Sequence, residues 1–420
     1  MFNRKLNYFT ITIVLYILCI SYTYKSGIQL LISENTLFRS SNQVLAKYDE
    51  VRNRETYSDL KFSTNTYDAK VISKFPNNFG QINAKENATL LMLTRNFELK
   101  EVLKSMRSLE DRFNWRYHYD WTFMNDIPFS FEFQEATTAM ASGKTTYVTI
   151  PKSDWNRPSS INETRFEESL KKMSEDDVIY GGSKSYRNMC RFNSGYFYKQ
   201  SVLDSYDYYF RVEPSVEYFC DFPYDPFKLM REKNKKYGFV IATYEYEETI
   251  PTLWDTIEKY IDLKSNTTDI NMTSNSYDFI TDQSIIGKFG LGRKSSCSYN
   301  MCHFWSNFEI GDLNFFRSTK YQDFFDYLDA SGGFYYERWG DAPVHSIAAS
   351  LLLETNEIIH FDELGYSHSP FMTCPYSYYM RIAHRCQCDY DNVNNIPLTL
   401  SSCLMRWWKN GAGKFFTKEN

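Results

Sequence analysis

Carboxylates gather in one short stretch, RVEPSVEYFCDFPYD (residues 211–225), directly after the aromatic run YDYYF. The segment YDYYFRV is rich in β-forming residues, and Pro214 cannot donate a hydrogen bond to a strand ladder, so we expect Glu213 at the C-terminal end of a strand. Open α/β sheets bind ligands at that end. A carboxylate there suits manganese or magnesium bridging the two phosphates of a nucleotide sugar, where the cation would neutralise charge on the leaving diphosphate. The alternative is a solvated acidic turn.

Candidate chemistry continues further along the chain. CHFWSNFEIGDLNFFRS places Glu309 in an apolar setting, where a carboxylate is either functional or a buried structural group. His368 lies in the loop-like segment GYSHSPF. It is either a metal ligand or a structural histidine. The segment GGFYYERWGDAPVHSIAASLLL carries a group of polar residues that lead into an apolar helix: Glu337, Arg338, Asp341 and His345.

Common nucleotide and hydrolase motifs are incomplete or missing. ASGKTT ends like a phosphate-binding loop, but Thr138 stands where the first glycine is required. GKFGLGRKSS has neither the spacing nor the strand-to-helix context of a dinucleotide turn. The sequence contains no G-x-S-x-G elbow and no HExxH zinc helix, which argues against the common hydrolases.

The elements that must position these residues alternate between strand and helix. TLLML predicts a buried strand, and ELKEVLKSMRSLEDRF places apolar residues on one helical face. YDWTF and the segment leading to ATTAMASG repeat the theme, as do YGFVIATY and PTLWDTIEKYIDLK. We therefore expect an α/β fold, a sheet flanked by helices, in one catalytic domain over residues 86–420.

Composition narrows the class of protein. With 420 residues and 43% hydrophobic content, the chain can bury a substantial core. Its net charge of −5 gives no basic field, so nucleic acid is not expected as a partner. Aromatic residues make up 18% of the chain, and their flat faces suit packing against sugars as well as against each other.

The N-terminus predicts a membrane anchor. Residues 6–24 carry no charge, and Arg4 and Lys5 precede them, so the positive-inside rule keeps residues 1–5 in the cytoplasm. A cleaved signal peptide is the alternative, but CISYTYKSG lacks a small-x-small site. Residues 25–85 are polar and poorly periodic, as expected of a stem that holds a lumenal domain away from the membrane.

Two further features fit a lumenal domain. Glycosylation sequons begin at Asn87, Asn162, Asn266 and Asn271. Of the 9 cysteines, all except Cys19 follow the expected anchor, an even number that fits disulfides in an oxidising compartment. CSYNMCH and HRCQC are alternatively read as metal clusters, but we expect disulfides rather than zinc.

Several of these segments resemble, in the same order, one known family. Four segments are similar to blocks of the fungal Golgi α-1,2-mannosyltransferases, the Kre2/Mnt1-like glycosyltransferase family 15. They are YYFRVEPSVEYFCDFPYDPF, CHFWSNFEIGDLNFFRS, GGFYYERWGDAPVHSIA and GYSHSPFMTCP. LTRNFEL, LEDRFN, YDWTFMND, SGKT and SYRNMCRFNSGYFY match as well. The resemblance covers the chain from about Thr89 to the SCLMRWW segment.

The resemblance implies a fold, a reaction and a location. The fold would be GT-A-like, with a mixed central sheet, and the reaction would be a retaining transfer of mannose from GDP-mannose to a mannoside of N- or O-linked glycans, with Mn2+. The partners would be the donor and a mannosylated glycoprotein or oligosaccharide acceptor. The protein would be a single-pass type II protein of the Golgi membrane, which agrees with the tail, anchor and stem expected from the residues.

The resemblance also assigns candidate site residues. Glu213 and His368 look like the protein ligands of the manganese, a pair that suits this ion because imidazole is a poor ligand for magnesium. Glu309 resembles the proposed nucleophile, acting either through a mannosyl-enzyme ester or by stabilising an ion pair during front-face attack. Tyr186 looks like the tyrosine close to the reacting sugar.

Charge suggests further candidates. Arg95 and Arg211 are candidates for binding the nucleotide or its phosphates, although Arg211 could instead pair with a neighbouring acid. Asp341 and Glu337 are candidates for shaping the sugar or acceptor site. Within the acidic stretch, the carboxylates beyond Glu213 are expected to hold the loop or to orient the ligands.

Two other functions stay open on the sequence. Transfer of mannosylphosphate to the same glycans would use the same donor and would leave phosphate in the product. A non-catalytic Golgi glycan-binding protein would tolerate the loss of Glu309.

Overall fold

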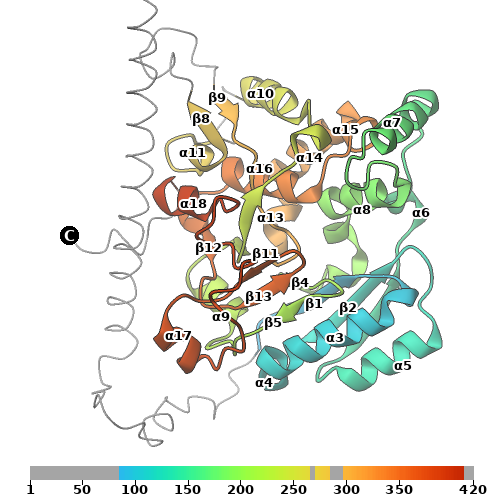
Figure 1. The fold of residues 1–420 in the computed structure, drawn as a ribbon. Coiled ribbons are helices and arrows are strands. Elements are labelled where there is room, and N and C mark those ends of the chain that lie inside the picture. Colours follow the sequence, from blue (N-terminus) through green and yellow to red (C-terminus); the bar gives the residue numbers. More distant parts are fainter. Residues whose placement is uncertain (1–84, 265–269, 284–296, 411–420) are drawn as a thin grey trace, which may run out of the picture. The chain divides into compact units, whose positions relative to one another are not determined.

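The structure is a computed structural model in which residues 85–264, 270–283 and 297–410 are described (Figure 1). All of them belong to one of the two units into which the chain divides, Asp68–Gly413. The expected tail, anchor and nearly all of the stem lie outside the described residues, as do GKFGLGRKSS and the sequon at Asn266. Within the described ranges, no helix has the length and apolarity needed to cross a membrane.

A seven-stranded mixed sheet forms the centre of this unit, in the order β12-β6-β11-β4-β1-β2-β3. Its strands are β1 (Ala88–Leu93), β2 (Asp120–Asn125), β3 (Thr145–Thr149), β4 (Tyr208–Arg211), β6 (Tyr237–Phe239), β11 (Glu309–Asp312) and β12 (Ile358–His360). β11 runs antiparallel to its neighbours β4 and β6, and the other neighbouring pairs are parallel. Because β1 and β4 are parallel, their C-terminal ends meet at one edge of the sheet, next to Arg95 and Glu213.

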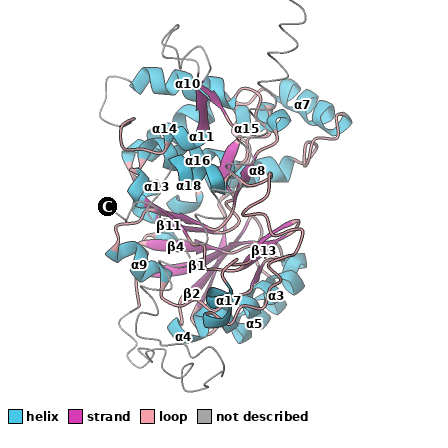
Figure 2. Cartoon of the chain, turned by 60° about the vertical axis from the view of Figure 1, so that its left-hand side comes forward, coloured by secondary structure: helices cyan, strands magenta, loops and turns pink. Residues whose placement is uncertain are grey.

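Helices lie on both sides of this sheet (Figure 2). The longer ones are α3 (Leu99–Leu109), α5 (Phe131–Met140), α7 (Glu163–Glu175), α8 (Lys184–Gly195), α10 (Leu253–Lys264), α14 (Thr319–Ser331) and α16 (Asp341–Leu352). The shorter ones are α4 (Trp115–Tyr117), α6 (Lys152–Trp155), α9 (Pro226–Glu232), α11 (Tyr277–Ile280), α13 (Leu313–Arg317), α15 (Gly333–Tyr336), α17 (Tyr378–Ala383) and α18 (Leu404–Asn410). Short 3-10 helices are η2 (Asn96–Glu98), η4 (Phe197–Lys199), η5 (Ser201–Leu203), η6 (Glu247–Thr249) and η7 (Thr355–Glu357). A π-helix, η3 (Glu110–Asn114), follows α3.

Alternate residues of the central strands face two separate cores. Leu90 of β1 is buried in the core that contains Val102 of α3, whereas its neighbour Leu91 is buried in the core that contains Ile347 of α16. This is the expected alternation of side chains along a strand. The sheet is therefore enclosed on both faces, and its C-terminal edge is left to bind ligands.

The remaining strands of the described residues form three small sheets. They are β10-β7, β14-β13-β5 and β8-β9. Their strands are β5 (Glu217–Tyr218), β7 (Ala242–Tyr244), β8 (Thr281–Gln283), β9 (Cys297–Tyr299), β10 (Cys302–Phe304), β13 (Tyr366–His368) and β14 (Phe371–Thr373). In the sheet β14-β13-β5, residues from near the C-terminus pair with the segment that follows Glu213.

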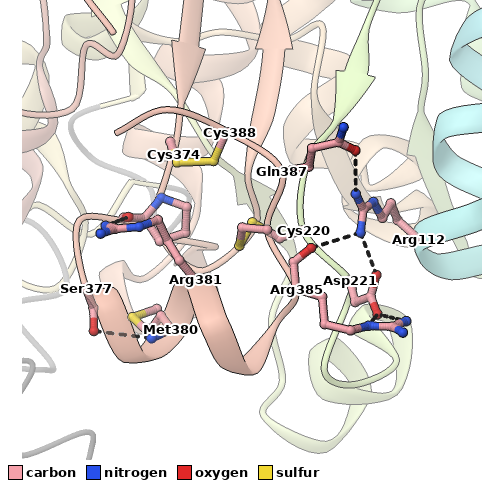
Figure 3. The surroundings of a disulfide bond; sticks show 12 residues. Arg112, Cys220, Asp221, Cys374, Ser377, Met380, Arg381, Arg385, Gln387 and Cys388 are labelled. Carbon is pink, nitrogen blue, oxygen red and sulfur yellow. Dashed lines mark hydrogen bonds and ion pairs between the residues drawn. A yellow bond between two sulfur atoms is a disulfide. The ribbon is translucent and has the colours of Figure 1, made fainter. Parts of the chain in front are cut away.

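Disulfides join segments that are distant in the sequence. Cys220 bonds Cys386, and Cys374 bonds Cys388, so the loop around α17 is tied both to itself and to the acidic stretch (Figure 3). Beside them, Asp221 accepts hydrogen bonds from Arg112 and Arg385 (Figure 3). A third disulfide joins Cys302 of β10 to Cys403 at the start of α18.

The expected α/β fold is confirmed, and two details of the expectation are wrong. YGFVIATY forms two strands in different sheets, because the chain leaves β6 at Val240 and pairs β7 with β10. The eight cysteines do not all pair, because Cys190 is free and buried inside α8. The reading of CSYNMCH and HRCQC as metal clusters finds no support, since Cys302, Cys386 and Cys388 are all in disulfides.

Candidate active site

A cleft of about 1250 Å³ opens at the C-terminal edge of β1 and β4. This volume is large enough to hold a nucleotide or another ligand of similar size. All the residues that the sequence proposes as catalytic, nucleotide-binding or metal-binding line it: Arg95, Tyr186, Arg211, Glu213, Glu309 and His368.

Glu213 and His368 meet in this cleft although they are far apart in the sequence. β4 ends at Arg211, which leaves Glu213 just beyond the strand, as expected. β13 pairs with β5 and so carries His368 to the same place. The His368 Nε2 atom lies 3.8 Å from the Glu213 Oε2 atom, and both side chains are about a quarter exposed.

This pair fits a manganese ion. The His368 Nδ1–H donates to the carbonyl of Ser369 at 3.1 Å, which leaves Nε2 with its lone pair directed away from that bond. A metal-binding histidine usually has its second ring nitrogen held in this way. Among the described residues, no group of three or more histidine, cysteine or acidic side chains could hold a metal. The chain would therefore supply these two ligands, and phosphate and water oxygens would complete the set.

Arg211 lies between two carboxylates, and its side chain is 12% exposed. Its Nη2 atom lies 2.5 Å from Glu213 Oε1, and its Nη1 atom bonds Asp341 Oδ2. Burial acts to lower the pKa of Arg211, but attraction to Asp341 and Glu213 outweighs it and holds the pKa well above the ordinary value. Of the two roles predicted for Arg211, the structure shows the pairing with neighbouring acids.

Glu309 is the first residue of β11 and lies opposite Arg211 in the antiparallel pairing. It is fully buried, and both of its oxygens accept hydrogen bonds. Tyr209 donates to Oε1, and Oε2 lies 2.6 Å from the Tyr237 hydroxyl and 2.8 Å from His345 Nδ1. Burial acts to raise the pKa of Glu309, but the attraction and hydrogen bond of His345, with Arg211 and Tyr209, hold it below the ordinary value.

Asp341 begins α16 one turn before His345. Its carboxylate binds Arg211 and accepts a hydrogen bond from the Ser306 hydroxyl at 2.9 Å. Burial acts to raise the pKa of Asp341, but attraction to Arg211 and His345 lowers it overall. Sequence reasoning singled out Asp341 and missed the contact of His345 with Glu309. The spacing of four residues in an apolar helix, which puts both side chains on one face, was the available signal.

Arg95 and Tyr186 line another part of the cleft. Arg95 bonds Ser185 at 2.7 Å, lies 3.2 Å from Asp126 and stacks 5.4 Å above the Trp155 ring. The Tyr186 ring is stacked on Tyr180 at 4.4 Å between centroids, and burial raises its pKa well above the ordinary value. Tyr186 therefore stays a neutral hydroxyl at the wall of the cleft.

Three buried polar side chains of the cleft have unsatisfied atoms. Asn193 Nδ2, His303 Nδ1 and Arg338 Nε lack hydrogen-bond partners within the described part of the chain. Arg338 lies 3.7 Å from Glu245 and 5.2 Å from the centre of the Tyr186 ring. Unpaired buried polar groups are uncommon, and in a cleft they mark places where a ligand or water completes the bonding.

Other acidic candidates have structural roles. Glu337 is absent from the cleft wall and bonds Thr252 and Trp339 instead. Asp221 holds the loop through its arginine partners, and Asp225 caps the N-terminus of α9. The expectation that the carboxylates beyond Glu213 hold the loop therefore describes these two residues.

Sequence comparison places the chain among known proteins. The family model for glycolipid 2-alpha-mannosyltransferase matches residues 36–412. The probable mannosyltransferase KTR2 of Saccharomyces cerevisiae is 62% identical over 388 residues, which cover 92% of this chain and 90% of the relative. The alpha-1,2 mannosyltransferase KTR1 of the same yeast is 48% identical over 344 residues, covering 78% of this chain and 82% of the relative.

Solved structures give the same result. Core-mannan synthase A of Aspergillus fumigatus, solved in a Mn/GDP form, matches with a TM-score of 0.70 and 38% identity, covering 78% of this chain and 86% of the other. The S. cerevisiae mannosyltransferase Ktr4p in complex with GDP matches with a TM-score of 0.68 and 32% identity, over 89% and 92% of the two chains. This GT-A-like glycosyltransferase therefore belongs to the glycolipid 2-alpha-mannosyltransferase family.

Proposed function

We propose that the protein is a manganese-dependent, retaining α-1,2-mannosyltransferase that transfers mannose from GDP-mannose to mannose residues of N- or O-linked glycans. The observation that carries the proposal is the meeting of Glu213 and His368 in the cleft, one strand away from Glu309. The manganese and GDP bound by solved relatives support the choice of cofactor and nucleotide.

The chain's own residues would prepare the donor site. Glu213 and His368 would hold the manganese, which when bound supplies positive charge to the phosphates of the leaving GDP. Arg211 orients the Glu213 carboxylate through its bond to Oε1, so that Oε2 faces His368. Asp341 in turn fixes Arg211 from the other side. Arg95, which lies in the cleft beyond the end of β1, is our candidate for binding the nucleotide.

Glu309 would act through its charge. Its side chain is enclosed, and both oxygens already accept hydrogen bonds, so an attack on the anomeric carbon would require these bonds to break. This arrangement supports the ion-pair role over the mannosyl-enzyme ester. Tyr186, with its neutral hydroxyl at the cleft wall, is the candidate for steadying the reacting sugar.

The acceptor would bind beside these groups. The unsatisfied atoms of Asn193, His303 and Arg338 suit hydroxyl groups of mannose, which both donate and accept hydrogen bonds. The three disulfides support folding in an oxidising compartment, in keeping with the proposed lumenal domain of a type II Golgi protein.

The test uses the full-length chain in detergent with GDP-mannose, methyl α-mannoside and either Mn2+ or a chelator. We expect an α-1,2-linked disaccharide, identified by NMR, only with Mn2+. Glu213→Gln and His368→Ala should each reduce the rate by more than about 100-fold at limiting Mn2+, because direct ligands matter at least as much as the residues that orient them. Glu217→Gln, which alters an exposed carboxylate of the same stretch, is the matched control and should keep the rate.

Other products would decide against the proposal. Phosphate in the product would indicate mannosylphosphate transfer. A folded protein that binds GDP and glycan without turnover would indicate a glycan-binding protein. Full activity of Glu213→Gln would refute the proposed metal site.

A further inference from the structure

The buried carboxylate of Glu309 contacts His345, a residue to which the proposed function gives no role. His345 lies on α16, inside the core and 1% exposed, with its ring between two acceptors. Its Nδ1 atom is 2.8 Å from Glu309 Oε2, and its Nε2 atom is 3.0 Å from the backbone carbonyl of Asn193. His345 thus connects β11, which carries Glu309, to α8, where Asn193 lines the cleft.

These contacts determine the protons on the ring. A backbone carbonyl can only accept a hydrogen bond, so Nε2 must carry a hydrogen. Glu309 also accepts from the hydroxyls of Tyr209 and Tyr237, whose pKa values burial raises well above the ordinary value, so both stay protonated donors. An ionised Glu309 then requires Nδ1 to carry a hydrogen as well. In this arrangement the ring donates one hydrogen bond from each nitrogen, to the Asn193 carbonyl and to the Glu309 carboxylate.

We propose that His345 is a positioning residue for mannosyl transfer, a protonated histidine that keeps Glu309 ionised and fixes it between β11 and α8. This role rests on the proposed function, because it assigns Glu309 a charge that the reaction uses. His345 itself touches no substrate in this role. It acts by holding the negative charge of Glu309 beneath the reacting sugar, where positive charge develops.

The neighbouring groups do not replace the charge of His345. Phenols face the pair from β4, β6 and α14, and they donate hydrogen bonds or line the site without carrying charge. The guanidinium on β4 is already shared by Glu213 and Asp341. The thiol on α8 is buried and its pKa is raised, so it is neutral. The titratable or charged groups around the pair are Cys190, Tyr209, Arg211, Tyr237, Tyr321 and Asp341.

Removal of the imidazolium should therefore change the pH profile. Without that positive charge, burial would dominate and raise the pKa of Glu309, so the carboxylate of the variant should become protonated at a higher pH than that of the wild type. His345→Gln should lower kcat by about 100-fold or more at pH 7.5, with a further loss at pH 6. The KM for GDP-mannose should stay within about threefold, because the nucleotide contacts are elsewhere in the cleft.

Tyr237→Phe is the matched control. It removes a hydrogen bond from the same Oε2 atom without changing the charge of the site. We expect a loss in kcat of less than about tenfold, and a smaller shift of the acid limb of the profile than in His345→Gln. Equal losses in both variants with parallel pH profiles would overturn the proposal, because they would show that packing alone matters. Wild-type kcat in folded His345→Gln would overturn it too.

A direct measurement does not depend on turnover or on the stability of a variant. The full-length chain, labelled with 15N in its 6 histidine rings, would be studied by NMR between pH 5.5 and 8. We expect one ring, absent from the spectrum of His345→Gln or else identified by its contacts to aromatic rings, to carry hydrogens on both nitrogens at neutral pH. A bare Nδ1 at neutral pH would refute the proposal, whichever sugar the enzyme transfers. Failure to form a mannoside would instead refute the proposed function and leave the ring result standing.

Discussion

The disulfides allow a prediction in which stability and activity rank the variants in opposite orders. Cys302–Cys403 closes a sequence separation of 101 residues, and Cys374–Cys388 closes one of only 14. In the chain-entropy treatment, loops of these lengths give about 4.7 and about 3 kcal/mol of stabilisation. Replacing both cysteines of a pair by serine should therefore cost about 1.7 kcal/mol more for Cys302–Cys403 than for Cys374–Cys388.

Manganese dependence should follow the other order. β13 and β14 form the hairpin that carries His368, and Cys374 directly follows β14. Loss of the short loop's disulfide loosens the segment that brings His368 to Glu213. The disulfide of Cys302 ties β10 to the start of α18 and touches neither ligand. We expect the variant of the short loop to need at least about tenfold more Mn2+ for half-maximal rate, the lower end of the effect of residues that orient metal ligands.

Both variants would be made in the full-length chain, kept oxidised. Unfolding free energies come from urea titrations followed by tryptophan fluorescence, and the Mn2+ requirement comes from initial rates at fixed GDP-mannose. If the same variant is worse in both measurements, the site is sensitive to stability in general, and our account of how His368 is positioned is wrong. If the short-loop variant costs more stability than the long-loop variant, the entropic reasoning fails.

Two further predictions concern the residues around Arg211 and Glu309. Asp341→Asn should cost about 3 to 5 kcal/mol at pH 7, measured by urea unfolding, because it leaves the largely enclosed Arg211 with one charged partner fewer. Because the pKa of Asp341 is lowered on folding from its ordinary 3.8, its contribution is complete above pH 3.8 and disappears as the pH falls further, so the difference between variant and wild type should shrink in acid. Gly311→Ala would place a methyl group 2.6 Å from the Tyr209 ring, which donates to Glu309, and should cost about 1 to 3 kcal/mol and lower kcat. An unchanged melting temperature and kcat in Gly311→Ala would contradict the tight packing behind Glu309.

Local patterns were sufficient to predict the strand and helix that open the domain. The apolar run of β1 and the helical spacing of α3 are formed as expected, with Val102, Met106 and Leu109 buried. The position of Glu213 could be predicted because Pro214 ends the strand pairing locally. These features depend on neighbours in the sequence, so the sequence alone contains the information.

Features made by distant segments could not be predicted in this way. YGFVIATY reads as one strand, but β7 pairs with β10 and not with the central sheet. The even number of cysteines fits disulfides, and six cysteines of the described residues do pair, but which ones pair and that Cys190 is free and buried in α8 depend on segments far apart in the sequence. The spacing of Asp341 and His345 shows that both lie on one face of a helix, but the contact of His345 with Glu309 joins residues 36 positions apart, which no local pattern describes.

The pairing of β13 with β5 has a consequence for the nascent chain. Translation delivers Glu213 at mid-chain, well before the strand that carries His368. The proposed metal-binding pair therefore cannot form on a partial chain that lacks β13, and long-range pairing of this kind is slow. A ribosome product that stops before Tyr366 would contain β1, β4 and Glu213 but would lack His368, so only one of the two proposed metal ligands would be present. Catalytic competence is thus a late event, reached only when nearly the whole polypeptide has been made.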